Sequence, residues 1–159
     1  MTDFVSARRH MVDGQIRTTD VTDLRVISAM LEVAREKFLP PAVTWLAYLD
    51  LDVPVGASRR LLKPMVLAKL IQAAELAATD RVLDAGCATG YGAAVLARIA
   101  GQVVALEQDG GRLVCVLGSG PGSKAMLYRR SGGEVGGRAI FDATAALLPG
   151  FAKTPVFAF

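Results

Sequence analysis

The sequence predicts a single α/β domain built around a parallel βαβ unit, and the order of its central segments is the main observation. Residues 81–85 and 101–107 are short apolar strand candidates, separated by a glycine-bracketed turn at 86–90 and an alanine-rich helical stretch at 91–100. Strand, turn, helix and strand in that order are typical of a βαβ unit. Apolar residues recur at helical spacing before this region and in short runs after it. A length of 159 residues suits one domain with its own core.

The N-terminal third is predicted to be helical. Thr22 can cap a helix that carries Asp23 in its first turn, where a carboxylate suits the helix dipole. The apolar positions of this helix are Val26, Ile27, Met30 and Val33.

The next part of the chain is predicted to alternate between turns and helices. Prolines at positions 40 and 41 end one short segment, because a proline nitrogen cannot donate a hydrogen bond. Residues 42–49, with Trp45 and Tyr48, form an amphipathic stretch, and residues 50–56 an extended loop. Pro64 suits the first position of a helix over 65–77.

The C-terminal part is predicted to be β-structure. Residues 113–117 form a buried-strand candidate, and residues 124–131 and 134–141 a hairpin around a Gly-Gly turn. The alternating tail, 155–159, could add a last strand.

Composition excludes several classes of protein. Hydrophobic residues make up 52% and charged residues 21%, which is unlike a disordered chain. No apolar run approaches the roughly 20 residues that span a bilayer, and residues 1–10 lack the apolar core of a secretory signal. Cys87 and Cys115 have no metal-type spacing, so we expect no metal site and a reducing, cytoplasmic location. A net charge of +3 without a basic cluster predicts no nucleic-acid partner, and His10 is expected at the surface.

The glycine turn between Asp84 and Gly92 is the richest candidate site. Such a turn lets a ligand approach the backbone, and in parallel sheets ligands lie at the carboxyl ends of the strands. Glu107 ends the next strand 23 residues after Asp84, where a carboxylate can hold a ribose diol. The turn lacks a P-loop ending and a clean GxGxxG, and Asp84 would repel a pyrophosphate. These features favour S-adenosylmethionine, which has a sulfonium and an amino-acid end; the alternative is an ordinary tight turn.

Several stretches carry a resemblance to a known family. They are residues 11–12 and 15–17, 33–38 (VAREKF), 47–48 with 53–56 (AY and VPVG), Pro64 and Ala68, 80–84 (DRVLD) with 86–94, and 110–114 (GGRLV). Together they resemble the protein-L-isoaspartate O-methyltransferases, which are class I S-adenosylmethionine-dependent enzymes. The resemblance implies a Rossmann-like sheet with helices on both faces. It divides the chain into a helical and substrate-loop part (1–64), a cofactor-binding βαβ part (65–109) and C-terminal strands (110–159).

The resemblance also implies a cofactor, a substrate and site residues. The cofactor would be S-adenosyl-L-methionine, and the substrates would be isoaspartyl-containing proteins or peptides. The substrate carboxylate is already anionic, so the enzyme aligns it and removes its water rather than deprotonating it. The implied cofactor-binding residues are Asp84, Gly86, Cys87, Ala88, Thr89, Gly90, Tyr91 and Glu107.

The substrate loop departs from the family pattern. The family has threonine, isoleucine and serine where this chain has Arg60, Leu61 and Leu62. Leu62 cannot hydrogen-bond a carboxylate, so the role of that serine cannot be transferred. Arg59 and Arg60 are the only catalytic candidates, because a guanidinium can grip a carboxylate; the alternative is that both are solvated surface charges.

The centre of the family's sheet is absent from this sequence. Only residues 108–111 separate Glu107 from the late glycine-rich strand, whereas the family topology requires a separation of more than about 20 Å. Five Cα steps from Glu107 to Arg112 reach at most about 18 Å. Either residues of the protein are missing from the sequence, or a natural deletion lets Asp109 and Gly110 close a new hairpin. An intact-mass measurement distinguishes the two.

Three functions therefore stay open. The first is methylation of an isoaspartyl carboxylate. The second is a non-catalytic homologue that acts through cofactor or protein binding, and the third is a methyltransferase with another substrate.

Overall fold

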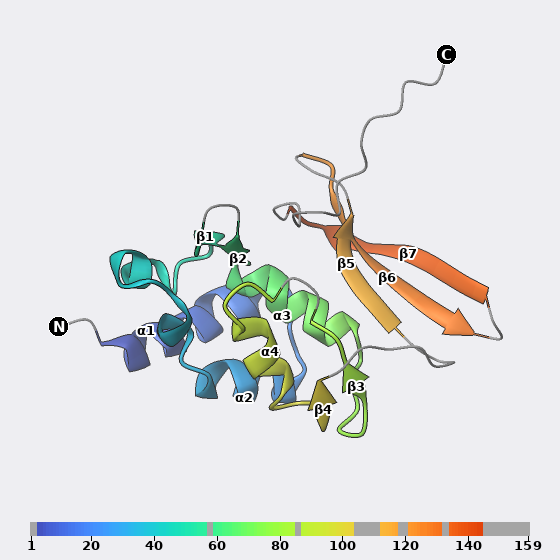
Figure 1. The fold of residues 1–159 in the computed structure, drawn as a ribbon, viewed down its shortest axis with the longest axis horizontal. Coiled ribbons are helices and arrows are strands. Elements are labelled where there is room, and N and C mark those ends of the chain that lie inside the picture. The colour runs from blue at the N-terminus through green and yellow to red at the C-terminus, as the bar shows by residue number, and fades with distance from the viewer. Residues whose placement is uncertain are drawn as a thin grey trace, which may run out of the picture.

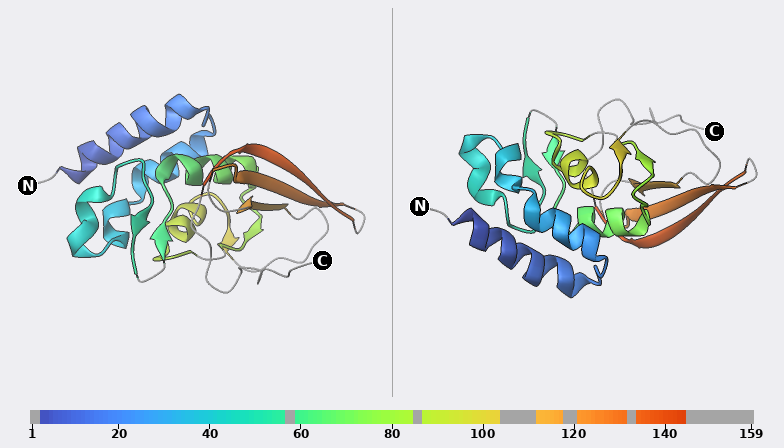
Figure 2. Two further views of the ribbon diagram at one scale, coloured as in Figure 1. Left: turned by 90° about the horizontal axis from the view of Figure 1, so that it is seen from above. Right: turned by 90° about the horizontal axis from the view of Figure 1, so that it is seen from below.

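The molecule consists of a helical body and a C-terminal three-stranded sheet that lies beside it (Figure 1). The computed structural model describes residues 3–56, 59–84, 87–103, 112–117, 121–131 and 134–144. In the views from above and below, the sheet starts alongside α3 (Pro64–Ala73) and extends away from the body (Figure 2). The predicted helical N-terminal part and the predicted C-terminal β-structure are therefore confirmed.

The first helices of the body follow one another closely. They are α1 (Phe4–Met11), the π-helical turn η1 (Val12–Ile16), the 3-10 turn η2 (Arg17–Thr19) and α2 (Leu24–Glu32). The prediction that Thr22 caps α2 is wrong. Asp23 is the N-cap, because its carboxylate accepts from the Arg25 amide, while the Thr22 amide donates to Gln72 of α3 at 2.7 Å.

Short 3-10 turns and a small hairpin precede α3. They are η3 (Arg35–Phe38), η4 (Pro41–Leu46), β1 (Val53–Pro54) and β2 (Arg60–Leu61), and β1 pairs antiparallel with β2. Helix α3 begins at Pro64 as predicted but ends at Ala73, before residue 77, because Glu75 takes a left-handed conformation with φ 51°. Trp45 does not join the core, since 67% of its surface is exposed.

The predicted βαβ unit is present. It consists of β3 (Arg81–Val82), α4 (Tyr91–Leu96) and β4 (Gln102–Val103), and β3 and β4 are parallel. Strand β3 is shorter than the predicted range, because residues 83 and 84 are not in a strand. The predicted strand residues 85 and 104–107 lie outside the described part. Helix α4 ends before residue 100, because the next turn closes with tighter bonds such as Ile99 N to Leu96 O at 2.9 Å.

The C-terminal sheet is an antiparallel meander of β5 (Arg112–Leu117), β6 (Lys124–Ser131) and β7 (Glu134–Asp142). The hairpin of β6 and β7 was predicted. The strand β5 was also predicted, but it is not fully buried, because Leu113 and Leu117 are 57% and 59% exposed. Among the described strands, β5 pairs with β6 and not with β3 or β4. The sheet is thus partial, as the missing centre predicts; the turn at 109–110 and the tail at 155–159 lie outside the described residues.

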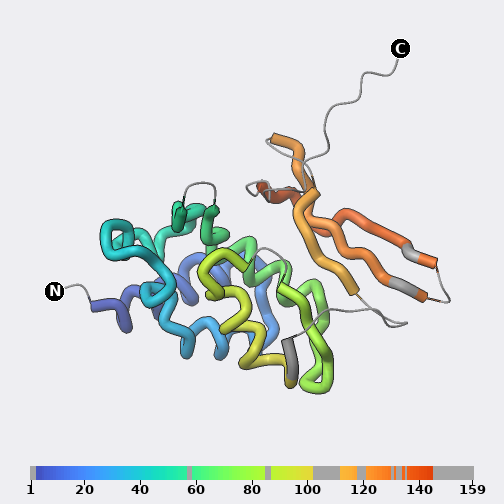
Figure 3. Tube along the Cα trace, viewed as in Figure 1, coloured from blue at the N-terminus to red at the C-terminus, as the bar shows by residue number. Residues whose placement is uncertain are grey.

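Two hydrophobic clusters hold these parts. The larger one fills the body and includes Met11, Ile16 and Met30, each at most 1% exposed. The smaller one joins α3 to the C-terminal sheet through Val66, Ala125 and Ala143. The tube in Figure 3 shows the blue-to-yellow part of the chain winding through the body before the orange part forms the sheet. No described helix is long and apolar enough to cross a membrane.

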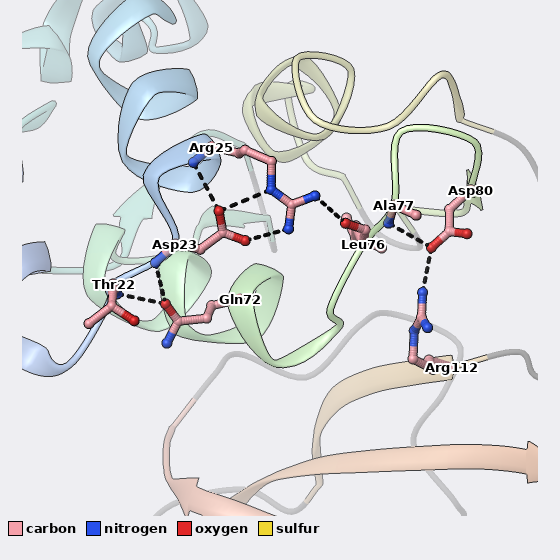
Figure 4. A network of polar contacts seen from close by, with 8 residues as sticks. All are labelled: Thr22, Asp23, Arg25, Gln72, Leu76, Ala77, Asp80 and Arg112. Atoms are coloured by element: carbon pink, nitrogen blue, oxygen red, sulfur yellow. Dashed lines mark hydrogen bonds and ion pairs between the residues drawn. The ribbon is translucent and has the colours of Figure 1, made fainter.

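Hydrogen bonds and ion pairs connect elements of the body with one another and with the C-terminal sheet (Figure 4). Gln72 accepts from the amides that precede α2, and Arg25 donates to the Leu76 carbonyl at 2.6 Å. Asp80 accepts from the Ala77 amide at 3.0 Å and pairs with Arg112 at the start of β5. The ion pair therefore holds the first residue of β5, Arg112, next to Asp80, the residue that precedes β3.

Candidate functional site

Asp84 is a half-buried carboxylate at the start of α4. It accepts a hydrogen bond from the Ala93 amide, while its Oδ2 is buried without a hydrogen-bond partner. A Cβ at position 92 would lie 2.6 Å from that oxygen, so Gly92 is what allows Asp84 to approach the helix. Burial raises the pKa of Asp84, and the Ala93 amide opposes this rise only in part. The arrangement leaves one desolvated oxygen able to accept from a cationic donor.

The turn before α4 is tight and partly left-handed. Ala88 and Gly90 have φ of 52° and 93°, and the Gly90 amide donates to the Cys87 carbonyl at 2.7 Å. Cys87 and Thr89 are exposed. Cys87 therefore does not pack in the core. Gly86 and Glu107 lie outside the described residues, so their predicted roles stay predictions.

Tyr91 lies underneath this turn rather than beside it. Its ring is fully buried and contacts the ring of Phe38 edge to face, with centroids 5.6 Å apart. Burial raises the pKa of the Tyr91 hydroxyl to about 12, and the neighbouring Arg35 guanidinium opposes this rise in part. Tyr91, the first residue of α4, thus fixes the start of this helix in the core. Its predicted contact with a cofactor stays a prediction.

The substrate-loop residues lie on the small hairpin and at the start of α3. Arg59 and Arg60 are exposed, as the surface-charge alternative expects, and Arg60 reaches only the Asp52 carbonyl, at 3.4 Å. Leu62 packs against the small cluster between α3 and the C-terminal sheet. Its side chain therefore faces packing partners, which agrees with the loss of the family's serine at this position.

Arg35 is a polar residue of this region that the sequence analysis did not single out. Its side chain is 0% exposed, and it donates to the Ala47 carbonyl through Nε and to the Leu62 carbonyl through Nη2, both at 2.8 Å. Its guanidinium carbon lies 4.8 Å from the centre of the Tyr91 ring. Arg35 stands beside two other charged residues in the VAREKF stretch, so the local sequence gave no signal that it is buried.

Tyr48, which the sequence places in the amphipathic stretch over residues 42–49, is buried. Its hydroxyl hydrogen-bonds Glu36, and its carbonyl accepts from Gln15 at 2.9 Å. Burial and the neighbouring Glu36 raise the pKa of Tyr48. The structure therefore brings together Asp84, the turn and Tyr91, and joins Tyr91 to Leu62 through Arg35. The described residues include no cluster of three His, Cys, Asp or Glu side chains able to hold a metal.

Two solved structures share the fold of this chain. A protein-L-isoaspartate O-methyltransferase superposes with a TM-score of 0.71 at 17% identity, over 90% of this chain and 66% of that one. A putative member from Plasmodium falciparum, solved in complex with S-adenosyl-L-homocysteine, gives a TM-score of 0.67 at 13% identity, over 92% of this chain and 98% of that one. The fold is thus an α/β Rossmann-like methyltransferase fold with a partial sheet.

Sequence comparison then gives the family. The model of the protein-L-isoaspartate(D-aspartate) O-methyltransferase family matches residues 6–116, and the chain belongs to this family. Protein-L-isoaspartate O-methyltransferase 1 of Rhodopseudomonas palustris is 42% identical over 109 residues, which are 69% of this chain and 44% of that protein. The enzyme of Methanoregula boonei is 41% identical over 103 residues, 65% of this chain and 48% of that protein. The chain therefore spans less than half the length of these relatives.

Proposed function

We propose that this protein binds S-adenosyl-L-methionine and methylates the carboxylate of isoaspartyl residues in proteins or peptides. The observation that carries the proposal is the Asp84 carboxylate, held at the start of α4 with one buried oxygen free. The membership of the family and the names of its relatives support the reaction class. The S-adenosyl-L-homocysteine bound to the Plasmodium neighbour supports the cofactor.

The residues present fit the amino-acid end of this cofactor. The free oxygen of Asp84 suits a bound ammonium group, because a charge-assisted hydrogen bond compensates a carboxylate for its lost water. The turn over 86–90 would wrap the methionine end, and Glu107 would hold the ribose hydroxyls. The cofactor supplies an activated methyl group on a sulfonium. The chain then has to orient the substrate carboxylate and exclude water, since no base is needed.

A binding experiment tests the cofactor part of the proposal. Calorimetry with S-adenosyl-L-homocysteine should show binding to the native chain, and Gly92→Ala should weaken it at least tenfold. The added Cβ would displace the Asp84 carboxylate, which is a side-chain end and not backbone, so the fold should survive. Gly14→Ala is the matched control, because nothing lies within 4 Å of a Cβ built there. Equal affinities of the two variants would remove Asp84 from the site, and no binding to the native chain would refute the proposal.

A transfer experiment tests the substrate. Labelled methyl should pass to an isoaspartyl peptide and not to the same peptide with a normal aspartate. Arg59→Ala and Arg60→Ala test the two arginine candidates; unchanged rates would leave them as surface charges. We place the helical and substrate-loop part in residues 1–64, the cofactor-binding part in residues 65–109 and C-terminal strands in residues 110–159.

One observation favours a second candidate, a family member that binds the cofactor without repairing isoaspartate. Leu62 packs against the C-terminal sheet instead of offering a donor to a substrate. Cofactor binding without transfer to the isoaspartyl peptide would support this candidate. Methylation of other acceptors would instead support a methyltransferase with a different substrate.

Location and partners follow from the composition. We propose a cytoplasmic protein, because both cysteines, Cys87 and Cys115, are free thiols. We propose no nucleic-acid or membrane partner, since the net charge of +3 is small.

A further inference from the structure

Burying the charged Arg35 costs desolvation free energy. Among the hydrogen bonds and ion pairs of the described residues, no carboxylate partner compensates this cost. Its bonds go to two main-chain carbonyls, and its Nη1 has no hydrogen-bond partner. Burial lowers the pKa of its guanidinium, although an arginine starts so far above neutrality that it stays charged. An apolar side chain of similar volume would fill this place at lower cost. What the arginine adds is a rigid fork with fixed directions.

One arm of this fork holds a single peptide group of the substrate loop, here residues 59–63. The Leu62 carbonyl accepts from Arg35 Nη2 at 2.8 Å, and the amide of the same peptide group, that of Lys63, donates to Asp52 at 2.8 Å. This peptide group is therefore held on both sides, immediately before Pro64 begins α3. The orientation of this peptide group sets the direction in which the loop residues enter α3.

The guanidinium lies over the ring of Tyr91, the residue that ends the cofactor turn, here residues 87–91. The Arg35 carbon lies 4.8 Å from the centre of the Tyr91 ring, within the range of a cation–π contact. Phe38, from the same η3 turn, contacts the other part of that ring. One short turn of chain thus touches both loops that the proposed reaction needs.

We infer that Arg35 is a positioning residue that fixes the substrate loop relative to the cofactor turn. The inference rests on the proposed function, which gives these two loops their roles. It assigns Arg35 no contact with substrate or cofactor. A substitution at Tyr91 should therefore alter the position of the Leu62–Lys63 peptide group through the guanidinium of Arg35.

Amide hydrogen exchange tests this link without any ligand. In Arg35→Met, the Lys63 amide should exchange at least tenfold faster relative to the Met30 amide, which reports global opening from the centre of α2. Arg25→Met is the matched control, because Arg25 also holds a distant carbonyl, that of Leu76, but does not reach Leu62. An equal rise in Arg25→Met, or no rise in Arg35→Met, would overturn the inference.

A double-mutant cycle tests the direction of the link. Tyr91→Leu should speed Lys63 exchange in the native background and have no further effect in Arg35→Met. Tyr91→Phe keeps the ring, so the Lys63 amide should exchange at the native rate in this variant. A changed rate would instead indicate a role of the hydroxyl. An effect of Tyr91→Leu that is the same in both backgrounds would overturn the inference.

Kinetics separate the link from the proposed function. In Arg35→Lys, which keeps the charge but not the fork, the KM for an isoaspartyl peptide should rise at least fivefold while the affinity for S-adenosyl-L-homocysteine changes less than twofold. A proportional loss of both would assign Arg35 to general stability and overturn the inference. If the native chain binds no S-adenosyl-L-homocysteine, the proposed function fails, and the exchange experiments still decide the link.

Discussion

The helical body and the C-terminal sheet keep their shape in different ways. The body buries a continuous core, and many of its polar contacts join residues that are far apart in the sequence, such as Gln72 with Asp20 and Thr22. The sheet is held internally by its antiparallel ladders. Its described contacts with the body include the small hydrophobic cluster, the Lys69–Phe141 cation–π contact and the ion pairs of Arg112 and Arg129. The body is therefore expected to determine the stability of the molecule, and the sheet to depend on its docking.

The largest expected effect comes from the core of the body. Met30 is 0% exposed, and Met30→Ala should lower the free energy of unfolding by about 2–5 kcal/mol through lost burial and a cavity. Urea unfolding followed by circular dichroism at the helix band measures it. A loss below about 1 kcal/mol would mean that the body is not the dominant unit.

The next effect comes from the contact between α3 and the sheet. Val66→Ala removes two methyl-sized groups and should cost about 2 kcal/mol, at about 0.8 kcal/mol each plus a cavity term. Amides of β5 to β7 should lose exchange protection before those of α2. Simultaneous loss in both regions would show that the sheet and the body unfold as one unit.

The two ion pairs across this contact should differ. Asp80 and Arg112 are 30% and 25% exposed, so Asp80→Asn should cost about 1–2 kcal/mol, between the values for exposed and buried pairs. Glu75 and Arg129 are 57% and 51% exposed, so Glu75→Gln should cost less than about 0.5 kcal/mol. Raising the salt concentration should weaken the second pair more. The reverse order would contradict the placement of Arg112.

The smallest effect concerns Asp84 and depends on pH. Its pKa in the folded chain is raised, so the folded state holds this proton to a higher pH than the unfolded chain, whose aspartates titrate near pH 4. The contribution of Asp84 to stability therefore falls as the pH rises through the folded pKa. Asp84→Asn should be more stable than the native chain at pH 7, and this advantage should shrink toward pH 4. Urea unfolding at both pH values checks it; an advantage that grows toward acid would contradict the burial of Asp84.

Local patterns in the sequence predicted the parts of the site that depend on neighbouring residues. Asp84 and the glycine turn were found because strand, turn and helix follow within a few residues, and the parallel pairing of β3 and β4 confirmed that unit. The half-burial of β5 could not be read from its apolar run, because a run does not show which face lacks a covering layer.

The role of Arg35 could not be predicted from the sequence, because its partners lie far from it along the chain. Its two carbonyl partners lie 12 and 27 positions along the chain, and the ring beneath it belongs to another helix. The cap of α2 was misplaced by one residue, since the Asp23 carboxylate accepts from the Arg25 amide, while Gln72 of a distant helix accepts from the Thr22 and Asp23 amides. Contacts of this kind depend on the packed structure and leave no periodic trace in the sequence.

Trp45, the chain's single tryptophan, gives the molecule an uncommon optical property. Since 67% of its surface is exposed on η4, its fluorescence should already be red-shifted in the native state and should change little on unfolding. An acrylamide quencher should reach it freely in the native chain. Any peptide or protein that covers η4 would shield this indole and shift its emission to the blue, so one intrinsic fluorophore reports docking on that turn without a label.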